Sequence, residues 1–258
     1  MNFPLILNLT RQDFTERYAG SIFGFFWAFL HPLALISIYL VVFSKIMGSR
    51  LPGNSEMENF SIYLVSGLLP WVAFSNTLIR TTTVFQDKKN IISKIKINLS
   101  TLPCYITLSE SVTFFISFSI FLFYYFFLVK LELNLIQLFC LFLLILFQQL
   151  LAFSLGLFFA ILNIFFRDTK EFVAIFVNIW FWLTPIVWVP SIAPKWLMEI
   201  QDNFNPAYWL ISSYRDLFVY SEIIELNHFF LIVLCVVITL SFSIVSLKFF
   251  EKDIRDFM

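Results

Sequence analysis

Residues 135–165 read LIQLFCLFLLILFQQLLAFSLGLFFAILNIF and contain no Asp, Glu, Lys or Arg. A helix rises 1.5 Å per residue, so about 20 apolar residues cross a hydrocarbon core of about 30 Å. This stretch is longer than that, and it lacks the polar face that a helix needs on the surface of a soluble protein. It therefore predicts a transmembrane helix.

Five other stretches have the same character. The six predicted spans are residues 26–44, 60–79, 103–129, 135–165, 172–190 and 228–247. His31 lies in the first and Glu110 in the third, whereas the other four contain no Asp, Glu, Lys or Arg. Only 13% of the 258 residues are charged, against about 25% in soluble domains. This composition excludes a soluble enzyme and predicts an all-α integral membrane protein with a single transmembrane domain over residues 1–258.

Lys and Arg are unevenly distributed over the connections between these spans. With the N-terminus inside, the cytoplasmic segments hold twelve Lys and Arg and the opposite side holds five. The acidic residues outside the spans divide evenly, eight to each side. Cytoplasmic loops retain positive charge, so the count places both termini in the cytoplasm. A net charge of zero gives no indication of nucleic-acid binding.

The N-terminal residues 1–20 alternate apolar and charged positions. Leu7, Phe14 and Tyr18 share one helical face by their spacing, which predicts an amphipathic helix in the cytoplasmic interface. An ordinary frayed tail is the alternative. Gly20 and Gly24 follow as a small-xxx-small pair, a pattern that permits close helix packing.

Residues 86–100 read QDKKNIISKIKINLS, a basic cytoplasmic connection with Ile91, Ile92, Ile95 and Leu99 at helical spacing. Such a segment fits a surface helix on anionic lipid. It fits equally a short docking helix that presents an apolar stripe to a cytoplasmic partner. The pattern alone does not choose between them.

Residues 191–227 lie outside the membrane in this topology, yet they are rich in Trp, Phe, Tyr and Leu. Irregular backbone at membrane depth must be buried in protein or line a wet cavity. We therefore expect a re-entrant helical pair at the extracytoplasmic side.

The sequence offers no catalytic, cofactor or metal site. Glu110 is the one carboxylate clearly inside a span; it fits a structural hydrogen-bonded residue better than an ion pathway. His31 and His228 fall at opposite ends of the topology, and Cys104, Cys140 and Cys235 have no metal or disulfide spacing. The chain also lacks the phosphate-binding loop Gly-x-x-x-x-Gly-Lys-Ser/Thr, so ATP-driven transport would need a separate ATPase subunit.

Aromatic side chains are abundant in the predicted spans. Most fit interfacial anchors, lipid-facing residues or core fillers. A minority could present flat faces to a translocating sugar chain, and the candidates for this channel lining are Trp27, Tyr39, Phe43, Trp71, Phe74, Trp180 and Trp182.

A series of short motifs runs along nearly the whole chain. They are Leu9-Thr10-Arg11, Arg17-Tyr18, Ser21, Gly24, Trp27, Pro32, Val42-Phe43-Ser44, Gly67-Leu68-Leu69-Pro70-Trp71, Phe166-Arg167-Asp168, Thr184-Pro185-Ile186, Asn205-Pro206 and Tyr214-Arg215. In this order they resemble the permeases of type-2 ABC exporters for O-antigen, capsular polysaccharide or teichoic acid.

The resemblance implies a homodimeric permease in the bacterial inner membrane that carries two separate ABC ATPase subunits and exports a lipid-linked polysaccharide such as O-antigen. ATP and Mg²⁺ would be bound by the partner and no cofactor by this chain. The amphipathic start and the basic loop would be the gate and coupling helices, and residues 191–227 the extracytoplasmic re-entrant helices. The implied coupling residues are Arg11, Arg17, Gln86, Asp87, Lys88, Lys89, Asn90, Ile91, Ile92 and Lys94.

Three other functions stay open at this point. A related exporter of lipids or drugs would have the same architecture. A membrane-embedded transferase would need clustered catalytic residues at one membrane face. A passive channel would need a ring of charged or carbonyl-rich filter residues, and no such sequence is visible.

Overall fold

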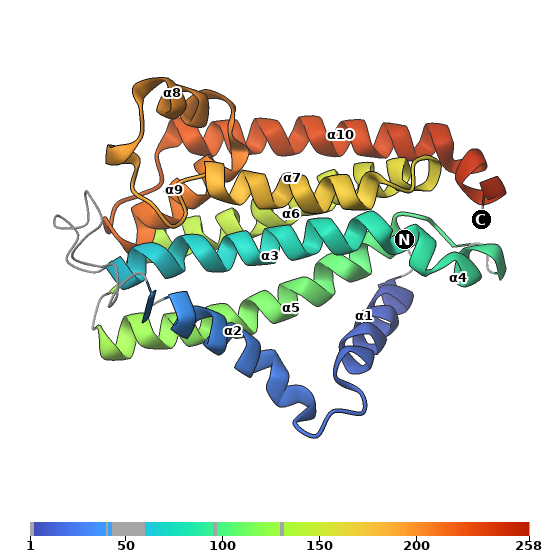
Figure 1. Cartoon of the computed structure of the whole chain (residues 1–258), viewed down its shortest axis with the longest axis horizontal. Coiled ribbons are helices and arrows are strands. Elements are labelled where there is room, and N and C mark those ends of the chain that lie inside the picture. The colour runs from blue at the N-terminus through green and yellow to red at the C-terminus, as the bar shows by residue number, and fades with distance from the viewer. Residues whose placement is uncertain (1–2, 40, 43–59, 95–96, 130–131, 258) are drawn as a thin grey trace.

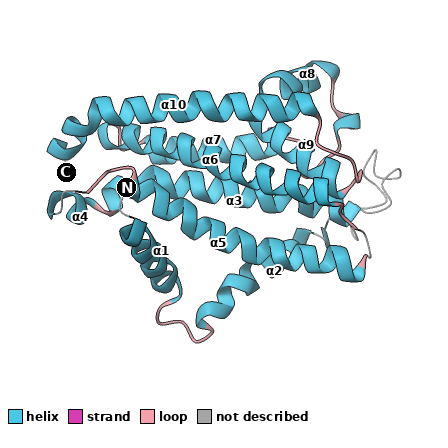
Figure 2. Ribbon diagram, turned by 180° about the vertical axis from the view of Figure 1, so that it is seen from behind, coloured by secondary structure: helices cyan, strands magenta, loops and turns pink. Residues whose placement is uncertain are grey.

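A computed structural model describes residues 3–39, 41–42, 60–94, 97–129 and 132–257. Within these ranges every regular element is helical (Figure 2). The α-helices are α1 (Phe3–Tyr18), α2 (Trp27–Tyr39), α3 (Phe60–Asp87), α4 (Lys89–Lys94), α5 (Thr101–Phe123), α6 (Leu135–Phe165), α7 (Thr169–Leu183), α8 (Lys195–Phe204), α9 (Pro206–Phe218) and α10 (Leu226–Phe257). The shorter turns are η1 (Gly24–Phe26), η4 (Tyr124–Leu128) and η5 (Pro190–Ile192).

In the described part of the chain, four helices are long and apolar enough to cross a membrane: α3, α5 with its extension to Phe127, α6 and α10. They coincide with four predicted spans. Helix α3 continues beyond the predicted end at residue 79, so Arg80 lies inside a helix and not in the expected loop. The other two predicted spans correspond to the shorter helices α2 and α7, and residues 40 and 43–44 of the first lie outside the described part.

Helix α3 forms the centre of the bundle (Figure 1). Of its most apolar stretch 83% is buried, against 22% for α10. A helix that is apolar on all sides is typically a buried one, and α3 packs against α5, α6, α7 and α9. At its crossing with α6, a Cβ added to Gly156 would lie only 2.7 Å from the Cβ of Thr81. This glycine therefore permits the close approach of the two helices.

The buried apolar residues divide into two clusters. The larger contains residues of α3, α5, α6, α7 and α9. The smaller one joins Ile6 of α1, Ile92 of α4, Leu99, Leu157 of α6 and Ile254 of α10. In Figure 1 the N-terminus, α4 and the C-terminus lie together at one end of the bundle, and α8 and α9 lie at the other.

Helices α1 and α2 form a V beside the bundle (Figures 1 and 2). The turn between them holds Gly20 at φ 75° and Gly24 at φ 48°, where L side chains are strained. No atom lies within 4 Å of a Cβ added at either position. Their interpretation as a helix-packing pair is therefore wrong, because these glycines make a turn.

Helix α1 packs against the bundle through residues other than Leu7, which the sequence assigns to the membrane interface. Ile6 and Leu9 are buried, whereas Leu7 is 47% exposed. Thr10, on the same side, hydrogen-bonds the Tyr105 carbonyl of α5 at 3.4 Å. Exposure of Leu7 is compatible with the predicted contact of this side with the membrane interface, whereas the inner face of α1 is apolar only near its start and continues in polar residues.

The basic connection over residues 86–100 contains a shorter helix than its periodicity predicts. Helix α4 ends at Lys94, and residues 97–100 are not helical because the Asn98 side chain accepts hydrogen bonds from Ser100 before α5 begins. Ile92 and Leu99 are buried in the chain's own core. The prediction of an apolar stripe presented outward is wrong for these two residues, and the exposed surface of α4 is polar and basic.

Candidate functional site

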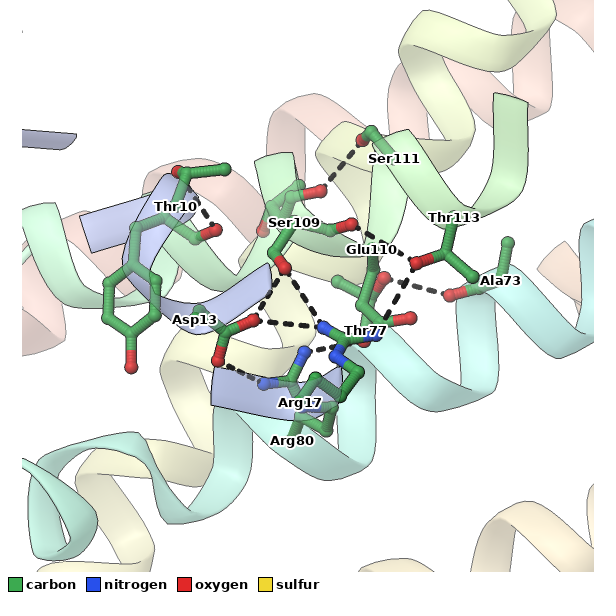
Figure 3. Close-up of polar contacts among 12 residues, drawn as sticks. Thr10, Asp13, Arg17, Ala73, Thr77, Arg80, Ser109, Glu110, Ser111 and Thr113 are labelled. Atoms are coloured by element: carbon green, nitrogen blue, oxygen red, sulfur yellow. Dashed lines mark hydrogen bonds and ion pairs between the residues drawn. The ribbon is translucent and has the colours of Figure 1, made fainter. Parts of the chain in front are cut away.

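Four charged side chains join α1, α3 and α5 (Figure 3). Nη1 of Arg80 lies 2.5 Å from Oε1 of Glu110, and Nη2 of Arg80 lies 2.6 Å from Oδ1 of Asp13. Nη2 of Arg17 lies 2.9 Å from Oδ2 of Asp13 and 3.0 Å from Oε1 of Glu110. Asp13 and Arg17 meet the bundle together because residues four apart share one face of a helix. We call these four residues the charged cluster; its charges balance.

Hydroxyl groups of α5 complete the hydrogen bonding of the charged cluster. Ser109 Oγ donates to Oδ2 of Asp13 at 2.5 Å and accepts a hydrogen bond from Nη2 of Arg17 at 2.9 Å. Burial by itself raises the pKa of the Asp13 carboxyl, but the hydrogen bonds from Ser109 and Arg80 hold it below its usual value. Asp13 is therefore ionised at neutral pH.

A cleft of about 690 Å³ opens beside the charged cluster. Arg17, Arg80 and Glu110 line one part of it, and Trp27 and His31 of α2 line another. The cleft thus combines ionic groups with aromatic rings between the V of α1 and α2 and the bundle. Elsewhere among the described residues, no three His, Cys, Asp or Glu side chains lie together in a way that could hold a metal ion.

The sequence identified only part of the charged cluster. Glu110 is 2% exposed, and it has two cationic partners. Arg17, one of the implied coupling residues, is ion-paired inside the chain. Asp13 and Arg80 were not predicted as site residues. Two signals could have found them: the spacing of four between Asp13 and Arg17, and the cost of an unpaired Glu110 inside a span.

The remaining predicted coupling residues lie on α1 and around α4. Arg11, Asp87, Lys89, Asn90 and Lys94 are exposed. Gln86 donates to the Asn163 carbonyl of α6 at 2.7 Å, and Lys88 lies 5.8 Å from the ring centre of Tyr105. Ile91 is half-buried and Ile92 buried. Most of the exposed polar residues of this group therefore lie together on or beside α4, whereas Arg11 lies on α1.

The aromatic residues proposed for a channel lie in three different environments. Trp71 and Phe74 are buried and pack edge to face on Trp180, with ring centres 5.7 and 5.6 Å apart. Trp27 lines the cleft, whereas Trp182 is 58% exposed. The side chain of Tyr39 and all of Phe43 lie outside the described residues.

Motifs that are far apart in the sequence meet near α8 and α9. The Asn205 side chain hydrogen-bonds Thr184 Oγ1 at 3.0 Å and accepts from Nε1 of Trp180 at 2.8 Å. The buried guanidinium of Arg215 donates to the Ile186 carbonyl at 3.0 Å and packs against Gly67. Arg215 also lies 3.5 Å from the ring centre of Tyr63. Four of the sequence motifs therefore form one junction between α3, α7 and α9.

Comparison with known proteins agrees with the resemblance that the order of these motifs indicated. Residues 4–219 match the family of ABC-2 type transporters. The chain belongs to this family. It is 28% identical to an O-antigen export system permease protein RfbA of Klebsiella pneumoniae, over 96% of this chain and 95% of that protein. A second protein of that name from the same organism is 28% identical over 84% and 81% of the two chains. One from Myxococcus xanthus is 26% identical over 83% and 80%.

Membership of the ABC-2 family shows what kind of protein contains the charged cluster and the junction. This ABC-2 chain is a transport subunit rather than an enzyme. With four helices able to span a bilayer, it is a multi-pass protein of the inner membrane. The region of the family match contains both the charged cluster and the junction.

Proposed function

We propose that this chain is the channel-forming permease of an ATP-driven exporter for a lipid-linked, O-antigen-like polysaccharide. The observation that carries the proposal is the likeness to O-antigen export permeases over nearly the whole chain. The permease acts as a homodimer with two separate ABC ATPase subunits, which bind ATP and Mg²⁺. The absence of a phosphate-binding loop from the sequence supports a separate ATPase.

The topology that we propose has six spans: α2, α3, α5, α6, α7 and α10. Both termini and α4 lie in the cytoplasm. The excess of Lys and Arg in the corresponding connections supports this orientation, as does the position of both termini and α4 at one end of the bundle (Figure 1). Helices α8 and α9 form the extracytoplasmic re-entrant pair, and their aromatic content supports that role.

Helix α4 is the coupling helix of this proposal and α1 the gate helix. The exposed residues of α4 include Lys89, Asn90 and Lys94, so the ATPase contacts it through a polar, acidic surface. Movement of the ATPase subunits acts on α4, and α1 follows because Ile6 and Ile92 share one apolar cluster. The charged cluster holds α1 against α3 and α5.

Co-purification with a co-expressed ABC ATPase subunit tests the proposal. The wild-type pair should form a stable complex whose ATP hydrolysis responds to lipid-linked O-polysaccharide. No complex, or a response to a lipid or drug instead of the glycan, would overturn the proposed function. Glycosyltransferase genes in the neighbourhood would support the glycan independently.

Reversing the charges on α4 should weaken this complex. We expect the double substitution Lys89→Glu with Lys94→Glu to reduce ATPase recovery about tenfold, because like charges facing each other across an interface are strongly unfavourable. Lys195→Glu is the matched control, since Lys195 is exposed at the opposite end of the molecule. Equal recovery with both variants would exclude α4 as the docking site.

The channel-lining hypothesis for aromatic residues is best tested at Trp182. Because its side chain is 58% exposed, Trp182→Ala should change the free energy of unfolding by less than about 0.5 kcal/mol. If it contacts the glycan, export falls while ATP hydrolysis and melting temperature stay at wild-type values. Trp71→Ala cannot serve this purpose, because Trp71 is buried and its loss disturbs the core itself.

A further inference from the structure

The last turn of α10 lies against the connection that contains α4. Ile254 is fully buried in the same cluster as Ile92 of α4, Ile97 and Leu99. The ring of Phe257 packs on Phe165 of α6, with ring centres 5.6 Å apart. Figure 1 shows the C-terminal end of α10 beside α4. The C-terminal turn is therefore part of the core that supports the proposed coupling helix.

Arg255 adds a directed polar contact to this packing. Its Nη2 donates to the backbone carbonyl of Ile97 at 2.7 Å, across 158 positions of sequence. The carboxylate of Glu251, one turn earlier on α10, lies 2.9 Å from the same nitrogen and 3.3 Å from Nε. Glu251 thus fixes the orientation of the guanidinium that holds the connection.

Helix α4 depends on such contacts because it has only six residues. Isolated helices of this length are unstable in water, so its position is determined by what it packs against. Toward α10, α4 itself has Ile92 in one apolar cluster with Ile254 and a 3.5 Å hydrogen bond from Lys89 Nζ to the Phe257 carbonyl. The Arg255 hydrogen bond holds Ile97, in the connection that follows α4.

We propose that Arg255 is a positioning residue for coupling, which ties the connection between α4 and α5 to α10. This inference rests on the proposed function, in which the ATPase moves α4. Helix α10 is continuous from Leu226 to Phe257 and packs against α9 at its other end. Displacement of α4 is thereby passed to α10 and along it to the junction at α9.

The test compares Arg255→Ala with the matched control Lys252→Ala, which removes an exposed cation from the same turn. Both are produced with the cognate ATPase, and two quantities are measured: ATP hydrolysis by the purified complex and export of O-polysaccharide by cells. We expect Arg255→Ala to keep the complex and to hydrolyse ATP within about twofold of wild type. Export per ATP should fall about tenfold, the effect of losing one hydrogen bond from a charged donor. Lys252→Ala should match wild type.

Two conservative variants separate positioning from folding. Arg255→Lys keeps the charge but lacks the planar fork that reaches both Glu251 and the Ile97 carbonyl, so it should have intermediate export per ATP. Glu251→Ala should show a smaller loss in the same direction. If Arg255→Ala does not elute as a folded protein in size-exclusion chromatography, Arg255→Lys decides the question in the same assays.

Several outcomes would overturn the inference. The first is export per ATP at the wild-type level in Arg255→Ala, or in Arg255→Lys if Arg255→Ala does not fold. The second is a parallel loss of ATP hydrolysis and export. The third is loss of the ATPase from the complex, which would make Arg255 a docking residue. A wild-type chain that binds no ATPase would instead overturn the proposed function. The two failures are therefore distinguishable.

Discussion

Replacing Glu110 by Ala should destabilise the folded chain by about 3 kcal/mol, because removing one partner of a buried ion pair leaves the other uncompensated. Glu110 is 2% exposed and accepts from Nη1 of Arg80 at 2.5 Å, with Arg17 at 3.0 Å. Without it, two guanidiniums face the single carboxylate of Asp13. We therefore expect α1 to detach from α3 and α5 before the bundle itself unfolds.

This effect is measured as the melting temperature of the detergent-solubilised protein, with size-exclusion chromatography used to monitor the folded fraction after heating. A loss of that size lowers the melting temperature by about 6 °C or more. Glu171→Ala is the control, because Glu171 is 71% exposed and its pair with Lys170 at 3.7 Å contributes little. Adding Arg80→Met to Glu110→Ala should recover part of the loss, since it removes one uncompensated cation. If Glu110→Ala and Glu171→Ala melt alike, the charged cluster does not stabilise the fold.

The pH dependence of this cluster follows from Asp13. Its pKa lies below the usual value, so the contribution of its ionised form is present above the unfolded pKa of about 3.9 and is lost as the pH falls through the folded pKa. Between pH 5 and pH 8 the contacts of Asp13 with Arg80 and Arg17 should therefore persist.

The long apolar helices were predictable from the sequence, whereas the pairing of the side chains in the charged cluster was not. Hydropathy identifies α6 or α10 without knowledge of any neighbour, because each helix satisfies its own backbone hydrogen bonds. By contrast, Asp13 meets Arg80 across 67 positions and Ser109 across 96. No local pattern encodes such pairings, and Arg80 also fell outside its predicted span because α3 extends to Asp87.

The sequence motifs were visible, but their arrangement was not. Asn205 and Thr184 stood out as separate short motifs, and the structure joins their side chains at 3.0 Å. Arg215 likewise reaches Ile186 and Gly67. The inward orientation of Ile92 was mispredicted, because helical spacing shows which residues share a face and does not show what that face contacts.

Substituting Gly156 by Ala should loosen the crossing of α3 and α6 and cost about 2–3 kcal/mol, the upper range for overpacking a core. The new Cβ would lie 2.7 Å from the Cβ of Thr81 and 2.9 Å from its Cγ2. A rotamer change does not move the Cβ of Thr81, so the backbones of the two helices must separate. Gly67→Ala is the comparison on α3: its Cβ would lie 3.2 Å from Nη2 of Arg215 and from Cγ2 of Ile211, a milder clash, so we expect a smaller loss than at Gly156.

Exchanging the small and the large residue across this crossing separates overpacking from a general intolerance of Ala at position 156. Thr81 is buried, and its hydroxyl has no hydrogen-bond partner among the described residues, so Thr81→Gly loses packing and helix propensity but no hydrogen bond. The double variant Gly156→Ala with Thr81→Gly should have a melting temperature well above the value expected from the sum of the changes in the two single variants. Strict additivity would show that the contact between residues 81 and 156 does not limit how closely α3 and α6 pack. A favourable coupling would instead identify Gly156 as the residue that permits the central helix to contact α6, and so to hold Arg80 where it meets Glu110.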